Sequence, residues 1–174
     1  MIGVDSLLKG KKIPHIAVVG AGAMGSIYAC MFAEAGCSTS VVDIWREHID
    51  RIREFGLRIE GASGNRIIKN IFATTEISEL DVADLYVIAT KADGVSIAAR
   101  GIARVMDPSS LVLTIQNGLG ADERISKYMP INNVLLGVAE GFGASMKGPG
   151  HVHHNAMRQI RIGEMSGGKT RRLE

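Results

Sequence analysis

The sequence predicts an α/β domain whose core is a doubly wound, mostly parallel sheet. Short apolar runs rich in Val, Ile and Leu alternate along the chain with longer segments whose apolar residues recur at helical spacing. The length of 174 residues suits one domain with a single core. The 21 glycines and the low aromatic content of 5% fit tight turns beside a sheet of small side chains.

The first half of the domain is expected to contain two strand–helix units followed by a hairpin. Residues 1–12 are polar and basic, so we expect a mobile tail before the first strand. Gly36 and Gly56 stand where C-terminal helix caps belong. The expected strands cover residues 13–19, 39–42, 57–60 and 66–72, the last two paired as a hairpin. The expected helices cover residues 23–35 and 45–55.

The second half continues the alternation and ends in a C-terminal hairpin. Pro108 and Pro130 end the two helices expected here, because proline cannot continue a helix. The expected helices cover residues 95–105 and 121–129. The expected strands cover residues 85–89, 111–115 and 134–138, and the hairpin pairs residues 152–156 with residues 159–162.

A glycine-rich turn directly follows the first strand and opens the first helix. Residues 20–25 match G-x-G-x-x-G, the fingerprint of Rossmann-type dinucleotide-binding domains. Gly20 would make the tight turn, Gly22 would let the backbone approach a pyrophosphate, and Gly25 would let helix and strand pack closely. A purely structural strand-to-helix turn is the alternative. The residues predicted to bind a cofactor here are Gly20, Gly22, Ala23, Met24 and Gly25.

Asp43 stands at the end of the second predicted strand. In dinucleotide-binding domains an acidic residue at this place hydrogen-bonds the adenosine ribose. Its charge repels a 2′-phosphate, so we expect NADH to be preferred over NADPH. In the competing interpretation, Arg46 or Arg51 would swing over and hold the 2′-phosphate of NADPH.

A second phosphate-binding pattern lies near the end of the sequence. Residues 163–170 match G-x-x-x-x-G-K-[ST], in which Lys169 would contact phosphates and Thr170 a Mg²⁺ ion. Such a loop needs a helix after it, and the sequence ends at Glu174. We therefore favour a glycine-rich linker over a P-loop.

Composition and the remaining polar residues argue against several other classes. The formal net charge of +2 disfavours a nucleic-acid binder, and no apolar run is long enough for a membrane helix. Cys30 and Cys37 suit reduced thiols in a cytoplasmic protein. His151 and His153 would share one face of a strand, but no acidic or cysteine partner lies nearby in sequence. A polar strand face is favoured over a metal site.

Three further segments each follow a predicted strand or close the last hairpin. They are Thr-Lys-Ala at 90–92, Gln-Asn-Gly-Leu-Gly at 116–120 and Ile-Gly-Glu at 162–164. Together with the turn at 20–25, this ordered set resembles the cofactor domain of the ketopantoate reductase (2-dehydropantoate 2-reductase) family. The resemblance extends over residues 13–164, and four motifs in the same order make it fairly specific.

The resemblance implies an oxidoreductase that passes a hydride from NADH or NADPH to the keto carbon of a small 2-keto acid. The expected substrate is 2-dehydropantoate (ketopantoate), reduced to pantoate on the route to pantothenate and coenzyme A. Lys91 and Asn117 would lie at the nicotinamide end of the cleft and position the substrate, and both would contact the cofactor together with Thr90 and Gly118. Without the resemblance, Lys91 is read as a solvated helix-start residue and Asn117 as a turn residue.

The resemblance also divides the chain. We expect a tail at 1–12, an NAD(P)-binding domain at 13–164 and a linker at 165–174, with the family's helical domain and its general-acid Lys absent from these residues. Ile44 stands where NADPH-using members often place Arg, which again favours NADH. A homodimer would cover apolar surface left by the missing domain. A non-catalytic dinucleotide-binding module, or another keto-acid or hydroxy-acid dehydrogenase on the same fold, is the alternative.

Overall fold

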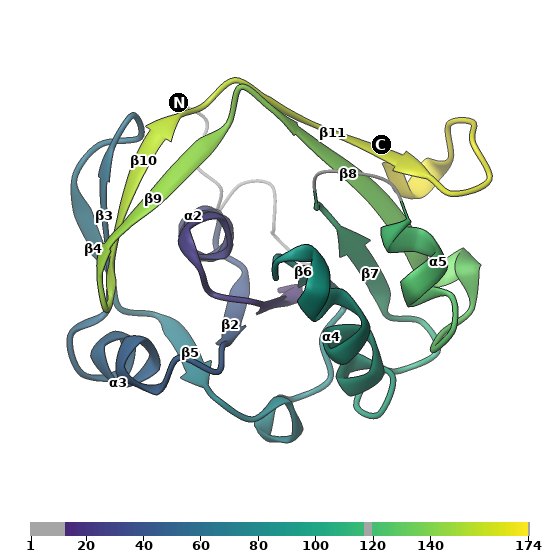
Figure 1. The fold of residues 1–174 in the computed structure, drawn as a ribbon, viewed down its shortest axis with the longest axis horizontal. Coiled ribbons are helices and arrows are strands. Elements are labelled where there is room, and N and C mark those ends of the chain that lie inside the picture. The colour runs from purple at the N-terminus through teal and green to yellow at the C-terminus, as the bar shows by residue number, and fades with distance from the viewer. Residues whose placement is uncertain (1–12, 117–119, 174) are drawn as a thin grey trace.

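The computed structural model describes residues 13–116 and 120–173, which form two β-sheets with a helix between them (Figure 1). The larger sheet has seven strands in the order β11-β8-β7-β6-β1-β2-β5. Its neighbouring pairs are parallel except for β8 and β11, which are antiparallel. Its strands are β1 (His15–Val19), β2 (Ser38–Val42), β5 (Ile71–Thr74), β6 (Leu85–Ile88), β7 (Leu111–Thr114), β8 (Val134–Glu140) and β11 (Gln159–Glu164).

The chain winds from the centre of the larger sheet towards each edge in turn. From β1 it builds β2 and β5 on one side, and then crosses back to build β6, β7 and β8 on the other. The strand order therefore reverses between β1 and β6, which is where open α/β sheets bind ligands. This doubly wound, mostly parallel sheet confirms the predicted fold class.

Helices cover both faces of the larger sheet. The α-helices are α2 (Ala23–Glu34), α3 (Arg46–Phe55), α4 (Val95–Ile102) and α5 (Ala121–Ile125). On one face α2 and α3 share a core that includes Val18 and Ile27, and on the other face α4 and α5 share a core that includes Tyr86 and Ile102. In the described parts of the chain, every helix is too short or too polar to cross a membrane.

A second, smaller sheet packs against α2 on the side away from the larger sheet (Figure 1). Its strands, in the order β4-β3-β10-β9, are β3 (Leu57–Gly61), β4 (Arg66–Ile68), β9 (Gly143–Gly148) and β10 (His151–Ala156). Leu57, Ile59 and Val152 from this sheet join the core that contains α2. The helix is therefore enclosed between two sheets.

The first predicted hairpin is only partly correct. β4 pairs antiparallel with β3 as expected, but the run over 66–72 is interrupted at Lys69 and Asn70, which are exposed. The residues after this break form β5, which leaves the small sheet and pairs parallel with β2. Two short strands separated by two polar residues have the same local pattern as one longer strand, so the sequence did not reveal the division.

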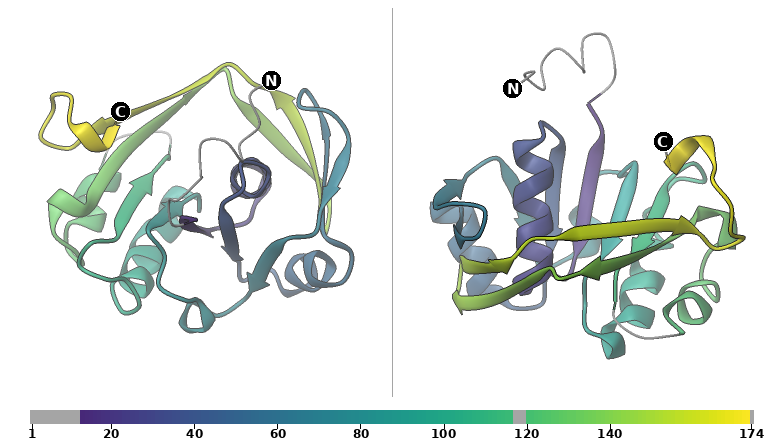
Figure 2. Two further views of the ribbon diagram at one scale, coloured as in Figure 1. Left: turned by 180° about the vertical axis from the view of Figure 1, so that it is seen from behind. Right: turned by 90° about the horizontal axis from the view of Figure 1, so that it is seen from above.

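The C-terminal hairpin exists, but its pairing was predicted wrongly. β10 pairs with β9 and β11 pairs with β8, so residues 152–156 and 159–162 do not pair with each other. The turn consists of Pro149 and Gly150, where Gly150 has a φ of 68°. The glycine-rich segment before it forms β9 although it lacks the branched side chains typical of strands. Both arms of this long hairpin run from one sheet to the other (Figure 2).

Candidate functional site

Four chain segments meet at the carboxyl ends of β1, β2, β6 and β7. The strand register aligns Val19 with Val42 and Ile88, and Ile88 with Thr114, so these strands end at one level. The loops that follow them border the switch point between β1 and β6. The structure brings four predicted parts of the site to this edge: the turn at 20–25, Asp43, Thr90 and Lys91. Gln116, which precedes the predicted site residue Asn117, lies at the same edge.

Gly20 and Gly25 have no room for a side chain. Gly20 has a φ of 100°, and a Cβ there would lie 2.6 Å from the Thr90 backbone nitrogen. A Cβ on Gly25 would lie 1.8 Å from the Gly20 carbonyl oxygen. The first glycine thus allows the turn to pass against the segment after β6, and the last allows α2 to pack on the turn, as their places in the motif predicted.

Gly22 differs from the other two glycines of the turn. A Cβ on Gly22 would meet no atom within 4 Å, so its glycine is not required by packing among the described residues. Gly22 is the N-cap of α2, with Ala23 and Met24 beginning the helix. The first N–H groups of a helix have no partners within it and carry partial positive charge. An anion could therefore approach the backbone here, which is the geometry that pyrophosphate binding needs.

Asp43 is half-buried directly after β2. Its backbone N–H donates to the Thr74 carbonyl oxygen at 3.2 Å, and its Oδ1 accepts the Trp45 N–H at 2.9 Å. These contacts place the carboxylate at the end of β2. Of the two arginines considered for a 2′-phosphate, Arg51 lies with its guanidinium carbon 4.2 Å from the centroid of the Phe55 ring, further along α3.

The segment after β6 carries a cation and a buried hydroxyl. Lys91 is exposed and precedes the short 3-10 turn at Ala92–Gly94, and it has no ion-pair partner among residues 13–116 and 120–173. Thr90 Oγ1 is buried and lacks a hydrogen-bond partner within the same ranges. Arg124 of α5 donates to the Ala92 carbonyl oxygen at 2.5 Å, and this hydrogen bond connects the segment after β6 to α5.

Gln116 holds the ends of β6 and β7 together, a role that sequence reasoning did not assign. Its amide nitrogen donates to the carbonyl oxygens of Ile88 at 2.7 Å and Thr90 at 3.3 Å. Its amide oxygen accepts the Thr114 hydroxyl. Asn117 and Gly118, both predicted site residues, lie outside the described residues.

Sequence reasoning also missed Ser26 and His48, which lie behind the glycine turn. Both side chains are fully buried. Ser26 Oγ donates to the Ala21 carbonyl oxygen at 2.8 Å and lies 3.4 Å from His48 Nε2. Burial lowers the pKa of His48, and the Asp43 carboxylate partly opposes this shift. A histidine on a polar helix surface gives no local sign that it will be buried.

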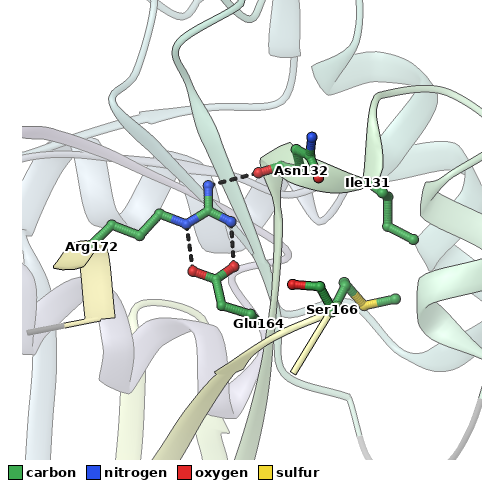
Figure 3. Close-up of a pocket in the computed structure, with 6 residues that line it drawn as sticks. Ile131, Asn132, Glu164, Ser166 and Arg172 are labelled. Carbon is green, nitrogen blue, oxygen red and sulfur yellow. Dashed lines mark hydrogen bonds and ion pairs between the residues drawn. The ribbon is translucent and has the colours of Figure 1, made fainter. Parts of the chain in front are cut away.

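The other phosphate-binding pattern has a structural role at the far edge of the sheet. Glu164, at the end of β11, accepts hydrogen bonds from Arg172 (Figure 3) and also from Thr170, and these lower the pKa of its carboxyl group to about 2. Arg172 also donates to the Asn132 carbonyl oxygen at 2.7 Å. The Thr170 hydroxyl is thus engaged by the Glu164 carboxylate instead of being available to a metal ion. This geometry is not that of a P-loop.

The two histidines of β10 have an acidic neighbour that the sequence did not reveal. Glu60 of β3 lies 3.0 Å from His151 Nε2 and 3.4 Å from His153 Nδ1. The parallel pairing of β3 with β10 brings these residues together across a long stretch of chain. Within the ranges that the structure describes, no three His, Cys, Asp or Glu side chains are grouped to hold a metal ion.

The fold and this edge define a Rossmann-type α/β domain of the class that binds dinucleotides in oxidoreductases. Its glycine turn lies at the switch point, and an acidic residue ends the neighbouring strand. Residues 16–167 match the family model described as ketopantoate reductase PanE/ApbA. The chain belongs to the ketopantoate reductase family, as the resemblance predicted.

Curated relatives and solved structures agree with this membership. The chain is 31% identical over 159 residues to a 2-dehydropantoate 2-reductase of Halobacterium salinarum, covering 91% of this chain and 52% of the relative. It is 33% identical over 138 residues to the Lactococcus lactis enzyme of the same name, covering 78% of this chain and 44% of the relative. The chain thus spans about half the length of the curated relatives it matches.

Two solved structures illustrate the range of the fold. The 2-dehydropantoate 2-reductase of Geobacter metallireducens superimposes with a TM-score of 0.83 at 26% identity, covering 91% of this chain and 52% of that one. D-mandelate dehydrogenase, solved with NADH and anilino(oxo)acetate, superimposes with a TM-score of 0.74 at 30% identity, covering 85% and 47%.

Proposed function

We propose that this chain forms the cofactor-binding half of an NAD(P)H-dependent reductase that converts a small 2-keto acid, foremost 2-dehydropantoate, to the 2-hydroxy acid. The observation that carries the proposal is the glycine turn at the switch point. Gly20 and Gly25 have no space for a side chain, whereas the space beside Gly22 is empty among the described residues. This is the arrangement expected where a backbone must approach a pyrophosphate.

The residues present fit a nicotinamide dinucleotide. The open space at Gly22 and the unpaired N–H groups that begin α2 suit the pyrophosphate. Asp43 is suited to accept hydrogen bonds from the adenosine ribose hydroxyls. The Thr90 hydroxyl, buried and without a partner in the described residues, would be able to hydrogen-bond the cofactor beside the turn. When bound, the cofactor would supply a hydride to the keto carbon.

Lys91 and Asn117 are proposed to orient the substrate at the nicotinamide end. The Lys91 ammonium group would attract the substrate carboxylate, and the Asn117 amide would hydrogen-bond the nicotinamide ribose or the substrate. Reduction of a ketone also needs a proton at the developing alkoxide. Among the residues of this chain we assign no general acid, so the proton donor would come from the helical domain of the family.

We propose NADH as the preferred cofactor. The negative charge of Asp43 would repel the 2′-phosphate of NADPH, and Ile44, which is 95% exposed, offers it no positive charge. We further propose that the protein acts in the cytoplasm, binds no nucleic acid and forms a homodimer. The exposed Val138 and Ile162 lie on opposite faces of the β8–β11 ribbon, and each offers apolar surface for such a contact.

Titration of the 174-residue chain with NADH and NADPH in parallel tests the binding proposal. Binding to the folded state should raise its stability by about 2.7 kcal/mol at a hundredfold excess over Kd. A larger effect of NADH supports the Asp43 assignment, and no effect of either cofactor contradicts the proposal.

Two other functions can be tested directly. The similarity to D-mandelate dehydrogenase favours comparing 2-dehydropantoate with bulkier 2-keto acids. Oxidation of NADH by the protein together with its helical domain, with one of these acids and not the others, would define the substrate. Cofactor binding without turnover of any keto acid would instead indicate a non-catalytic dinucleotide-binding module.

A further inference from the structure

A chain of buried hydrogen bonds connects the small sheet to the glycine turn through His48. His48 Nδ1 lies 2.9 Å from the backbone nitrogen of Gly150, in the turn between β9 and β10. Its Nε2 lies 3.4 Å from Ser26 Oγ in the first turn of α2, and Ser26 Oγ lies 2.8 Å from the Ala21 carbonyl oxygen. His48 and Ser26 are both 0% exposed, so water does not compete for these groups.

The chemistry of the donors and acceptors determines which group donates in each of these hydrogen bonds. The Gly150 N–H can only donate, so His48 Nδ1 must be unprotonated and accept. The Ala21 carbonyl oxygen can only accept, so the Ser26 hydroxyl gives its hydrogen to Ala21 and accepts from His48 Nε2–H. The geometry therefore requires a neutral imidazole with its hydrogen on Nε2.

The last bond of the chain determines how the glycine turn presents its backbone. Ala21 and Gly22 share one peptide unit, which is planar and trans, so its C=O and N–H point in opposite directions. Ser26 holds the Ala21 carbonyl oxygen in the buried interior. The Gly22 N–H is then turned away from Ser26, at the residue whose side-chain position is open.

We propose that Ser26 and His48 are positioning residues for cofactor binding, which hold the Ala21–Gly22 peptide so that the Gly22 N–H faces the pyrophosphate. This inference rests on the proposed function of the turn as a dinucleotide site. His48 acts through Ser26 and through its own hydrogen bond with the Ala21 carbonyl, and Gly150 and the ring of Trp45, stacked at 5.1 Å, hold His48 in its orientation.

The same geometry makes the chain of hydrogen bonds sensitive to protonation of His48. An imidazolium would direct its Nδ1–H against the Gly150 N–H, and two donors cannot bond each other. The elements packed on His48 present neutral groups at Ser26, Trp45, Gly150 and the Ala21 carbonyl, and the carboxylate whose charge acts on it is that of Asp43; the Ala21 carbonyl and the Asp43 carboxylate both favour the protonated ring, and burial opposes it more strongly. We expect cofactor affinity to fall as His48 becomes protonated in acid.

The test compares Ser26→Ala with a matched variant, Ser63→Ala. Ser63 Oγ also pairs with a buried histidine, at 2.8 Å from His154 Nδ1, but it lies in the turn between β3 and β4 of the small sheet. NADH affinity should fall about three- to tenfold in Ser26→Ala, the effect of one net hydrogen bond, and remain unchanged in Ser63→Ala. Equal affinities in the two variants would overturn the proposal.

His48 is tested by two substitutions that each keep one of its contacts. In His48→Gln an amide N–H can still reach Ser26, and in His48→Asn an amide oxygen can still accept the Gly150 N–H. NADH affinity should be closer to that of the native chain in His48→Gln than in His48→Asn, and its decline below neutral pH should disappear in both. The reverse order, or an unchanged pH profile, contradicts a positioning role.

A measurement without ligand separates this inference from the proposed function. Nitrogen-15 NMR of the imidazole should show the Nε2–H tautomer at neutral pH, and the Gly22 amide signal should move in Ser26→Ala but not in Ser63→Ala. If the native chain bound no dinucleotide, the proposed function would fail while these signals still tested the hydrogen-bond chain. An imidazolium or an Nδ1–H tautomer, or an unmoved Gly22 signal, would refute it.

Discussion

Replacement of Gly22 by valine should separate cofactor binding from folding. The backbone of Gly22 has φ −63° and ψ −166°, which a residue with a side chain can adopt, and a Cβ there meets no atom within 4 Å. The folded state should therefore lose only the advantage of Gly over Val at an N-cap, at most about 1 kcal/mol. That corresponds to a fall in Tm of about 2–4 °C for a chain of this size.

Binding should respond far more strongly than folding. The branched side chain would occupy the space through which a pyrophosphate reaches the turn, so we expect the Kd for NADH to rise at least about tenfold, or ~1.4 kcal/mol. Calorimetric titration and a thermal scan of the same samples measure both quantities. Gly148→Val is the matched control, because its Cβ position is also free within 4 Å but lies at the end of β9. A folded Gly22→Val protein with native affinity would refute the placement of the cofactor.

Three further substitutions test the charges and titrating groups of the domain. Asp43→Asn keeps an acceptor for the Trp45 N–H but removes the charge, so the ratio of NADPH to NADH affinity should rise; an unchanged ratio would place cofactor choice elsewhere. Burial lowers the pKa of His48 and of His154 below 6.5, so the native chain should lose stability as pH falls below about 6.5, where the unfolded state takes up protons first; denaturant titrations should show a smaller loss in His48→Gln, with the part due to His154 remaining. The pKa of Glu164 is lowered from 4.5 to about 2, so its stabilising effect should be present above pH 4.5 and disappear towards pH 2; Glu164→Gln should be less stable at neutral pH and flatter across that window.

The larger sheet and its glycine turn could be predicted because their signals are local. Each buried strand is a short apolar run, and each turn residue follows directly in sequence. The clashes at Gly20 and Gly25 show that these glycines are needed for the reasons that the motif suggests. Ligand binding by Lys91 remains a prediction, and Asn117 lies outside the described residues.

The missed features depend on contacts between distant parts of the chain. His48 is buried because the Gly150 turn, 102 residues later, closes over it. Glu60 meets His151 and His153 because β3 pairs with β10, and the pairing of strands so far apart cannot be read from either strand alone. Gln116 was visible in the sequence, but its contact with Ile88 needs the β6–β7 pairing to be known.

One signal for the small sheet was nevertheless present in α2. This helix carries apolar residues around its whole circumference, and a helix of that kind must be covered on all sides. A single sheet can cover only one side, so the sequence of Ala23–Glu34 required a second layer, which β3, β9 and β10 supply. Because the N-terminus of this helix is the proposed pyrophosphate site, the small sheet also holds that site against the larger sheet. Substitutions that weaken the contacts between the small sheet and α2 should therefore reduce cofactor affinity, although they change no residue that borders the cofactor.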